Sequence, residues 1–299
     1  MVSLKQLKYF DAVARSRHFG KAAEHCAVTQ PALSMQIQEL EKSLGVQLLE
    51  RGRSGVMLTE SGKEIAQRAA RVLADVRDIV DVARQQDKIL AGPLGLGVIP
   101  SVAPYILPQL LPMVRDAFPD LDLHIRESQT QSLVGELLDG QLDVLLLALP
   151  VEHPDIETVR LFDDRFLLAM AASHRMSNRV KATPDLLETE KLLLLEEGHC
   201  MREQALAFCS LRRIENINTF GASSLSTLVQ MVANGLGMTL LPELAVPLES
   251  RRGDIRLMRF ADPEPQRVIG LAWRRSSPRK RHFEELGQMI AATTAPRPL

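Results

Sequence analysis

The sequence of 299 residues lacks the features that mark membrane and secreted proteins. No apolar run approaches the roughly 18 residues that a membrane-spanning helix needs. The first eight residues do not form the apolar core of a signal peptide. The three cysteines are an odd number, which argues against a secreted disulfide framework. We therefore expect a cytoplasmic protein with no membrane partner, in a reducing compartment where disulfides are more often transient than structural.

Common signatures of enzymes and cofactor sites are also missing. Gly95-Leu96-Gly97 is not a dinucleotide fingerprint, because Pro100 stands where the third glycine belongs. No pair of histidines or cysteines has the spacing of a zinc site, and no Gly-x-Ser-x-Gly nucleophile elbow occurs. The sequence predicts a protein that is not an enzyme and that holds no cofactor and no metal.

The balance of charge excludes a polycation, because the net charge is −1. Residues 1–60 carry 8 Lys/Arg and 6 Asp/Glu, whereas the remainder carries 28 and 31. This asymmetry has the sign expected for an N-terminal DNA-binding module. The length predicts two or three domains.

Apolar residues at helical spacing predict three helices within residues 1–60. The first contains Leu4, Leu7, Phe10, Val13 and Ala14, the second begins at Phe19, and the third has the buried stripe Leu33, Ile37, Leu40 and Leu44. Thr29 fits the N-cap of the third helix and Pro31 its first turn. Two short strands, at 45–51 and 56–59, would follow around a turn. The pattern is that of a winged helix-turn-helix.

The third helix carries a polar face that is suited to a DNA groove. Its members are Gln30, Ser34, Met35, Gln38 and Glu41. We expect Gln30, Pro31, Ser34 and Gln38 to lie at the interface with a double-stranded DNA operator, and Arg51 and Arg53 to hold phosphates. The alternative for each residue is an ordinary solvated surface.

Residues 61–90 predict a linker helix that dimerises. Ile65, Ala69, Val72, Val76, Ile79 and Ala83 repeat at a spacing of four and three, which is a heptad seam. Two winged modules on one dimer would read a two-fold DNA site. Ala91-Gly92-Pro93 would end the helix as a hinge.

From Leu94 the period changes to that of an α/β domain. We predict strands at 94–99, 121–127 and 142–149 with helices at 102–117 and 130–138, a βαβαβ unit with a parallel sheet. Residues 91–163 with 268–299 would form one lobe, and residues 164–267 a second. Ser101 and Thr130 each follow a strand and open a helix, where a polar ligand or a plain helix cap is expected.

One segment of the second lobe contains two cysteines, Cys200 and Cys209, which bracket a predicted helix. Nine residues are 2.5 helical turns, which places the sulfurs on opposite faces and about 13 Å apart along the axis. A disulfide needs Cα atoms within about 7 Å, so these cysteines can pair only if the helix melts.

The two thiols have different surroundings in the sequence. The helix N-terminus, with His199 and Arg202 nearby, would favour a thiolate at Cys200. Cys209 follows Phe208 and suits a resolving thiol. The alternative is that both are buried and act as small hydrophobes, as we also expect for Cys26.

Two sequence motifs closely resemble those of the hydrogen-peroxide-sensing LysR-type transcriptional regulators. They are Glu197-Gly198-His199-Cys200 and Ala207-Phe208-Cys209. The resemblance extends to residues 92–100, 104–108, 224–228 and 237–242, and to Val28-Thr29-Gln30-Pro31 in the first domain. It implies a winged helix-turn-helix, a long linker helix and a two-lobed sensor domain like the periplasmic binding proteins. It also implies a homodimer or homotetramer that contacts RNA polymerase and controls oxidative-stress genes.

The resemblance also assigns the site residues. Cys200 would be the peroxide-reactive thiol and Cys209 its disulfide partner, with a peroxide pocket made by Ser101, Thr130, His199 and Arg267. Ser101 stands where threonine is common in that family, and Met35 where a basic residue is common. Three alternatives stay open: a LysR-type regulator whose cleft binds a small metabolite, a thiol peroxidase, and an extracytoplasmic solute-binding protein.

Overall fold

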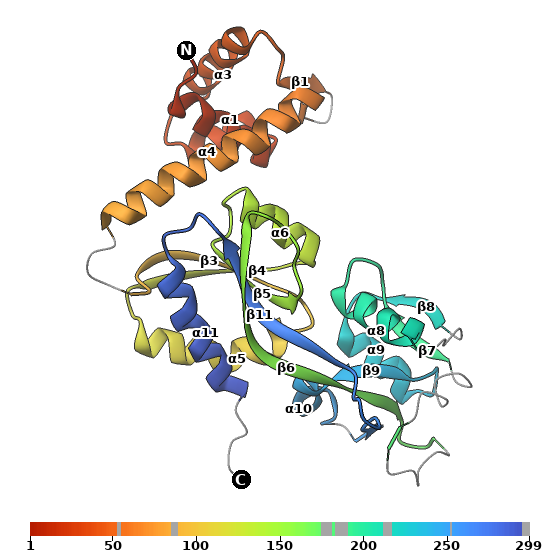
Figure 1. Ribbon diagram of the computed structural model, residues 1–299. Helices are drawn as coiled ribbons and strands as arrows, with labels where there is room; N and C mark the ends of the chain where they lie inside the picture. Colours follow the sequence, from red (N-terminus) through yellow and green to blue (C-terminus); the bar gives the residue numbers. More distant parts are fainter. Residues whose placement is uncertain are drawn as a thin grey trace. The chain divides into compact units, whose positions relative to one another are not determined.

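The computed structural model describes residues 1–52, 55–84, 89–174, 181–182, 191–211, 217–251 and 253–294. The chain divides into two compact units (Figure 1). The N-terminal unit comprises residues 1–87 with 136–141, and the C-terminal unit comprises 88–135 with 142–299. Among the described residues, none of the helices is both long and apolar enough to span a bilayer.

The N-terminal unit is a winged helix-turn-helix followed by a long helix, as predicted. Its elements are α1 (Leu4–Ser16), α2 (Phe19–His25), α3 (Gln30–Leu44), the antiparallel hairpin β1 (Leu49–Gly52) and β2 (Gly55–Leu58), and α4 (Glu60–Arg84). Ser3 and Gln6 form a capping box at the start of α1. The core contains Phe10, Val13, Leu33 and Leu40, all fully buried. Cys26 caps the end of α2 and is only half-buried.

Helix α3 begins as the sequence predicts, with one correction on its polar face. Thr29 is the N-cap residue, although its side chain makes no capping hydrogen bond, and Pro31 lies in the first turn. Glu41 does not face outward toward a groove. Its Oε1 accepts hydrogen bonds from the backbone N–H groups of Leu48 (2.7 Å) and Leu49 (3.1 Å). Glu41 therefore holds the start of the wing, because those donors would otherwise lack a partner.

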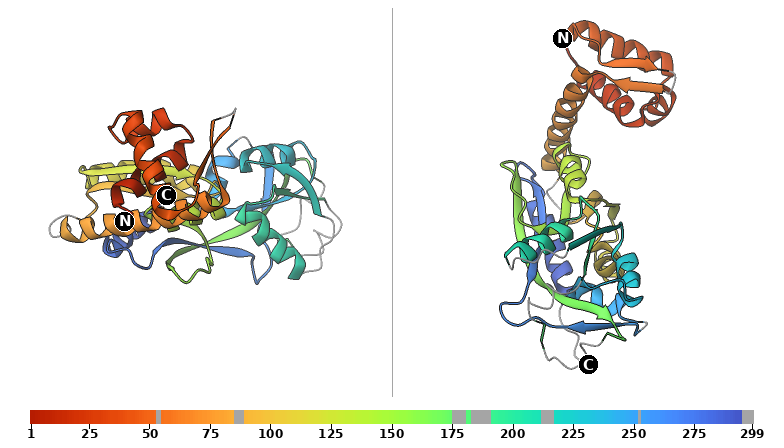
Figure 2. Two further views of the ribbon diagram at one scale, coloured as in Figure 1. Left: turned by 90° about the horizontal axis from the view of Figure 1, so that it is seen from above. Right: turned by 90° about the vertical axis from the view of Figure 1, so that its right-hand side faces the viewer.

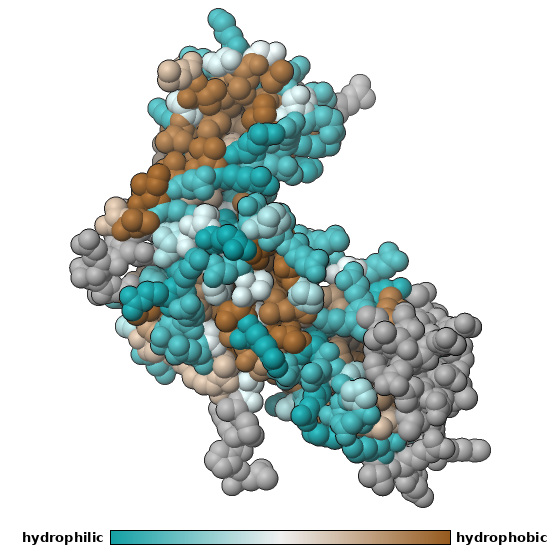
Figure 3. Space-filling view, viewed as in Figure 1, coloured by the Kyte–Doolittle hydropathy of each residue, from teal (hydrophilic) through white to brown (hydrophobic). Residues whose placement is uncertain are grey.

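The predicted seam on α4 is only partly free for a dimer. Ala69 is buried in the core of the winged domain, and Ile65 packs against the same core, so the first turns of α4 serve their own domain. Further along the helix, Val72 and Ile79 are 41% and 68% exposed. Brown, apolar surface is visible on the upper unit in Figure 3. The exposed apolar residues lie in the second half of α4, which is the part that can meet another chain.

The C-terminal unit contains a seven-stranded mixed sheet that extends through both lobes, and a separate pair of parallel strands in the second lobe. The first lobe contributes β3 (Gly92–Val98), α5 (Ala103–Ala117), β4 (Leu121–Glu127), α6 (Thr130–Leu138), β5 (Val144–Leu149), β11 (Gln266–Arg274) and α11 (Lys280–Thr294). Strand β3 pairs in parallel with both β4 and β5, which confirms the predicted βαβαβ unit. Strand β11 returns antiparallel beside β5. Buried leucines on β3 and β5 fill the space under the helices.

The second lobe is attached through the long strand β6 (Ile156–Ala171). The lobe contains β7 (Leu192–Leu195), α8 (Cys200–Leu211), β8 (Ile217–Ala222), α9 (Leu225–Ala233), β9 (Thr239–Pro242), the short η1 (Glu243–Ala245) and α10 (Val246–Glu249), and β10 (Ile255–Met258). Strand β6 pairs with β11 along its first part and with β9 and β10 along its second part. Figures 1 and 2 show β6 running from the side of α11 into the lobe of α8. The predicted boundary at residue 163 therefore falls inside a strand that both lobes share. The predicted boundary at 267 falls inside β11, so Arg267 lies on a strand of the first lobe and not in the second lobe as predicted.

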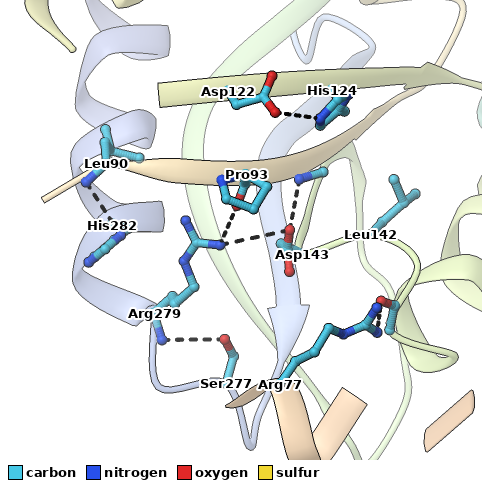
Figure 4. Close-up of polar contacts among 12 residues, drawn as sticks. Arg77, Leu90, Pro93, Asp122, His124, Leu142, Asp143, Ser277, Arg279 and His282 are labelled. Carbon is cyan, nitrogen blue, oxygen red and sulfur yellow. Dashed lines mark hydrogen bonds and ion pairs between the residues drawn. The ribbon is translucent and has the colours of Figure 1, made fainter. Parts of the chain in front are cut away.

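The chain that enters the C-terminal unit is fastened to α11 (Figure 4). Arg279 donates from Nη1 to the carbonyl oxygen of Pro93 at 2.9 Å and lies 3.9 Å from Asp143. The Asp143 carboxylate accepts from the N–H of Gly95 at 2.7 Å. The N–H of Leu90 is 3.4 Å from Nδ1 of the buried His282. These contacts hold the start of β3 against α11, the residue before it and the residue before β5, so the predicted hinge at 91–93 is anchored on its C-terminal side.

Candidate functional site

Cys200 is the first residue of α8 and is placed there by the loop that follows β7. The four leucines of β7 are buried, which anchors this strand in the second lobe. Gly198 follows with φ +90°, and a side chain there would collide with Gln129. Glycine is thus required for the turn, because a residue with a side chain is strained at this φ, whereas the end of the flexible Gln129 side chain could move aside. The turn brings Cys200 up to the start of α6.

Helix α8 is continuous from Cys200 to Leu211 and includes Cys209. Met201 and Ala205, four residues apart, are both 2% exposed and hold the helix on the core of the second lobe. Cys200 is a free, partly exposed thiol, while the side chain of Cys209 lies outside the described residues. The intact helix keeps the two backbone positions about 13 Å apart along its axis, as the spacing predicts.

Arg267 and Ser101 form a buried polar centre in the first lobe. Arg267 on β11 donates from Nη1 to Oγ of Ser101 (2.7 Å) and from Nη2 to the Ser101 carbonyl oxygen (3.0 Å). Its Nε lies 2.8 Å from Oδ2 of Asp164, and its guanidinium lies 5.8 Å from the ring of Phe166. Arg267 and Ser101 are 2% and 3% exposed. The arginine is therefore held rigidly with its charge inside the protein.

Two polar atoms on the helices α6 and α8 are among those that lack an ordinary hydrogen-bond partner within the described residues. They are Oγ1 of Thr130, the first residue of α6, and Oε1 of Gln204, one turn after Cys200 on α8. The Thr130 hydroxyl is still near enough to lower the pKa of Cys200. A buried polar atom without a partner costs about 1–3 kcal/mol, so both atoms are suited to hydrogen-bond a small polar ligand.

The electrostatics of Cys200 differ from the sequence-based prediction. Burial is the largest influence and raises the pKa of the Cys200 thiol above its usual value. The charge of Arg267, the hydroxyl of Thr130 and the N–H of Met201 oppose this shift without overcoming it. Arg202 is not among the groups that shift this pKa, and its Nη1 donates to the carbonyl oxygen of Leu195 at 3.1 Å. Desolvation thus affects the pKa of Cys200 more than the helix N-terminus and the nearby cation do, and a resting thiol is favoured over a thiolate.

Comparison with known proteins identifies both units. Residues 4–63 match the family "Bacterial regulatory helix-turn-helix protein, lysR family", and residues 88–295 match the family "LysR substrate binding domain". The chain belongs to the LysR family. Within it, this LysR regulator is 43% identical over 291 residues to the DNA-binding transcriptional dual regulator OxyR of Escherichia coli, covering 97% of this chain and 95% of that protein.

Solved structures agree with this assignment. A cysteine-to-aspartate variant of full-length OxyR from Pseudomonas aeruginosa is 36% identical, with a TM-score of 0.84, and the match covers 100% of this chain and 99% of that chain. A cysteine-to-serine mutant of OxyR from Corynebacterium glutamicum, with hydrogen peroxide bound, is 37% identical, with a TM-score of 0.69 and coverage of 97% and 92%. The chain therefore belongs to the OxyR group of LysR regulators.

The structure brings most of the predicted pocket of this LysR regulator together. Ser101 contacts Arg267 directly, and Thr130 and Arg267 both act on Cys200. His199 is buried beside Cys200 in the chain, but the described contact of its ring is with Glu196, 4.0 Å away. These residues come from both lobes, with Ser101, Thr130 and Arg267 from the first and Cys200 from the second.

Three polar residues of the site were not predicted from the sequence. Asp164 is the ion-pair partner of Arg267, Gln129 packs on the Gly198 turn, and Gln204 presents an unpartnered amide oxygen. The signal for Gln204 was available, because it lies four residues after Cys200 and shares its helix face. Asp164 had no local signal, because only the strand pairing of β6 with β11 places it beside Arg267.

The predicted DNA-facing residues of this LysR regulator lie at the start and along the open face of α3. Gln30, Pro31 and Gln38 are exposed and Ser34 is half-buried. Met35 is 53% exposed on the same face. Arg51 belongs to β1, with a side chain outside the described residues, and Arg53 lies outside them altogether. The face is accessible, as a groove-binding helix must be.

Proposed function

We propose that this LysR regulator senses hydrogen peroxide at Cys200, in a pocket formed by Ser101, Thr130 and Arg267 and lined by His199. The observation that carries the proposal is the free Cys200 thiol beside the Thr130 hydroxyl and the fixed Arg267 guanidinium, both of which act to lower its pKa. A small polar molecule that both donates and accepts hydrogen bonds suits a site that offers a hydroxyl, a thiol and a guanidinium. Hydrogen peroxide is such a molecule, and relatives are named for it.

The chemistry at Cys200 is a two-electron oxidation. The thiol loses its proton, and the sulfur attacks one peroxide oxygen, so that an S–O bond forms as the O–O bond breaks. The second oxygen leaves with a proton as water, and the cysteine becomes a sulfenic acid. The Arg267 guanidinium and the Ser101 and Thr130 hydroxyls would stabilise the negative charge that develops on the oxygens.

Cys209 would then resolve the sulfenic acid. Its thiol attacks the Cys200 sulfur, a disulfide forms, and the sulfenic oxygen leaves as a second water. The disulfide cannot form while α8 is intact, so oxidation must unwind it. Closing a loop of this length costs only about 3 kcal/mol in entropy, which makes the packing of Met201 and Ala205 the larger obstacle.

The unwinding of α8 provides a route from Cys200 to the rest of the sensor domain. The lobes also meet where Tyr105 of α5 donates to Glu249 of α10 at 2.9 Å, and Ser226 of α9 donates to the same carboxylate at 2.7 Å. Unwinding α8 would shift the second lobe, and the contacts of Glu249 would pass that shift to α5 of the first lobe. A segment with two discrete arrangements is a suitable switch, because it couples one bond to distant surfaces.

The output would be transcriptional control in the cytoplasm. Gln30, Pro31, Ser34, Gln38, Arg51 and Arg53 are the proposed contacts to operator DNA. The exposed second half of α4 suits a homodimer, and pairing of sensor domains would give a homotetramer that contacts RNA polymerase. Oxidation would change half-site spacing and thereby the regulation of oxidative-stress genes.

The function is tested by footprinting the protein on its operator. Reduced protein should change its protected half-sites after stoichiometric hydrogen peroxide, and a reductant should restore the first pattern. A matched sample treated with catalase before the peroxide should not change. A footprint indifferent to peroxide would favour the competing function, in which a metabolite in the cleft is the signal.

A further inference from the structure

Asp164 and Arg267 are opposite charges on neighbouring strands. They are paired directly across the antiparallel ladder of β6 and β11. Oδ2 of Asp164 lies 2.8 Å from both Nε and Nη2 of Arg267. The two side chains are 2% and 0% exposed, respectively. Removing either residue of such a pair destabilises the protein, because the other charge would be left buried without a partner.

The second carboxylate oxygen of Asp164 has a different partner. Oδ1 accepts a hydrogen bond from the N–H of Leu244 in η1, at 2.9 Å. The carboxylate therefore ties the arginine of the pocket to the segment that follows β9 in the second lobe. The adjacent Asp163 does nothing comparable. Successive side chains on a strand point to opposite faces, and Asp163 pairs with Arg160 on a more exposed face of β6.

Asp164 also determines how strongly the positive charge of Arg267 stabilises a thiolate at Cys200. The groups that act on or lie beside Cys200 are Arg267 from β11, Glu203 from its own helix, Glu196 and His199 from the preceding turn, and Thr130 from α6. Arg267 is the cation that most stabilises a thiolate there. An arginine with no carboxylate partner would attract the thiolate more strongly, because interactions in a dry interior are weakly screened.

We propose that Asp164 is a positioning residue for the peroxide reaction: it aims Arg267 at Ser101 and keeps the arginine from forming a resting ion pair with Cys200. The inference rests on the proposed function of Cys200. It gives the pocket a thiol that stays protonated until a ligand arrives and an arginine that is already aligned for the departing oxygen. General electrophiles, which need only a thiolate, would be disfavoured relative to peroxide.

The test compares two reactions of the Cys200 peptide in full-length protein, each followed by mass spectrometry. In Asp164→Asn, one amide oxygen cannot serve both Arg267 and Leu244, and the negative charge is gone. Alkylation by iodoacetamide should become faster at pH 7, by about tenfold for each unit that the pH profile of the thiol moves down. Oxidation by hydrogen peroxide should become at least about tenfold slower, because a misplaced group loses transition-state contacts.

Matched variants make the outcome specific. Asp163→Asn removes the same charge one residue away and should change neither rate. Asp164→Glu keeps the charge and shifts the carboxylate, so the pH profile of alkylation should stay that of the wild type while peroxide oxidation slows. If both rates fall together in Asp164→Asn, or neither changes, the positioning role is refuted. A wild-type Cys200 that does not react with peroxide would instead refute the proposed function before any variant is compared.

Discussion

Replacing Cys200 with serine is expected to abolish the peroxide response completely. Serine keeps the size of the side chain, but its hydroxyl cannot be oxidised to a sulfenic acid. Stoichiometric peroxide should then leave the operator footprint of Cys200→Ser in the reduced pattern. Cys26→Ser is the matched control, since Cys26 is a half-buried thiol at the end of α2 in the N-terminal unit. This control should respond like the wild type.

The second cysteine should behave differently. Cys209→Ser removes the resolving thiol but leaves the pocket of Cys200 in place. A sulfenic acid should still form at Cys200 and be trapped by a sulfenic-acid reagent, while no intramolecular disulfide appears. If Cys200→Ser still shifts the footprint with peroxide, or if Cys209→Ser cannot be trapped, the assignment of the two roles is wrong.

Arg267→Gln is expected to give the largest effect outside the cysteines. The variant removes the cation that opposes the rise in the pKa of Cys200 caused by burial, and it breaks the contacts that fix Ser101. We expect peroxide oxidation of Cys200 to slow by about 100-fold, in the range of losing a main electrostatic contact in a transition state. The free energy of unfolding should fall by about 3 kcal/mol, because Asp164 is left buried without its partner.

An exposed arginine provides the comparison. Arg259 lies 2.8 Å from Glu243, but both side chains are about half exposed, so solvent screens the pair. Arg259→Gln should leave the rate unchanged and alter stability by no more than about 0.5 kcal/mol. Stopped-flow oxidation and urea unfolding measure both effects. Equal losses in the two variants would show that the buried centre has no special role.

The elements of the fold were predictable because the local signals agree with one another. The three helices of the first domain, the wing and the βαβαβ unit follow from periodicity, caps and turn residues. The helix from Cys200 was also visible, since the segment after Gly198 contains no breaker. The capping of the wing by Glu41 was missed, because a polar residue on a helix face gives no sign that its target is a backbone N–H seven residues away.

The site was predicted in part, for a similar reason. Ser101 and Thr130 stand at strand ends, and the resemblance to the LysR-type regulators supplied Arg267. Asp164 and the state of the thiol depend on tertiary burial. Charge and helix position near Cys200 predict a thiolate, but sequence does not show how much solvent is lost, and that loss decides the direction of the pKa shift.

In the proposed switch, hydrogen peroxide leads to a disulfide between Cys200 and Cys209, and helix α8 unwinds. The most direct measurement is peptide mapping of the wild-type protein after stoichiometric peroxide, with free thiols blocked and the same sample footprinted on DNA. We predict a disulfide-linked 200–209 peptide that appears together with the shifted footprint and disappears with reductant. A shifted footprint without that disulfide would contradict the claim, and a ligand in the cleft would then explain the switch better.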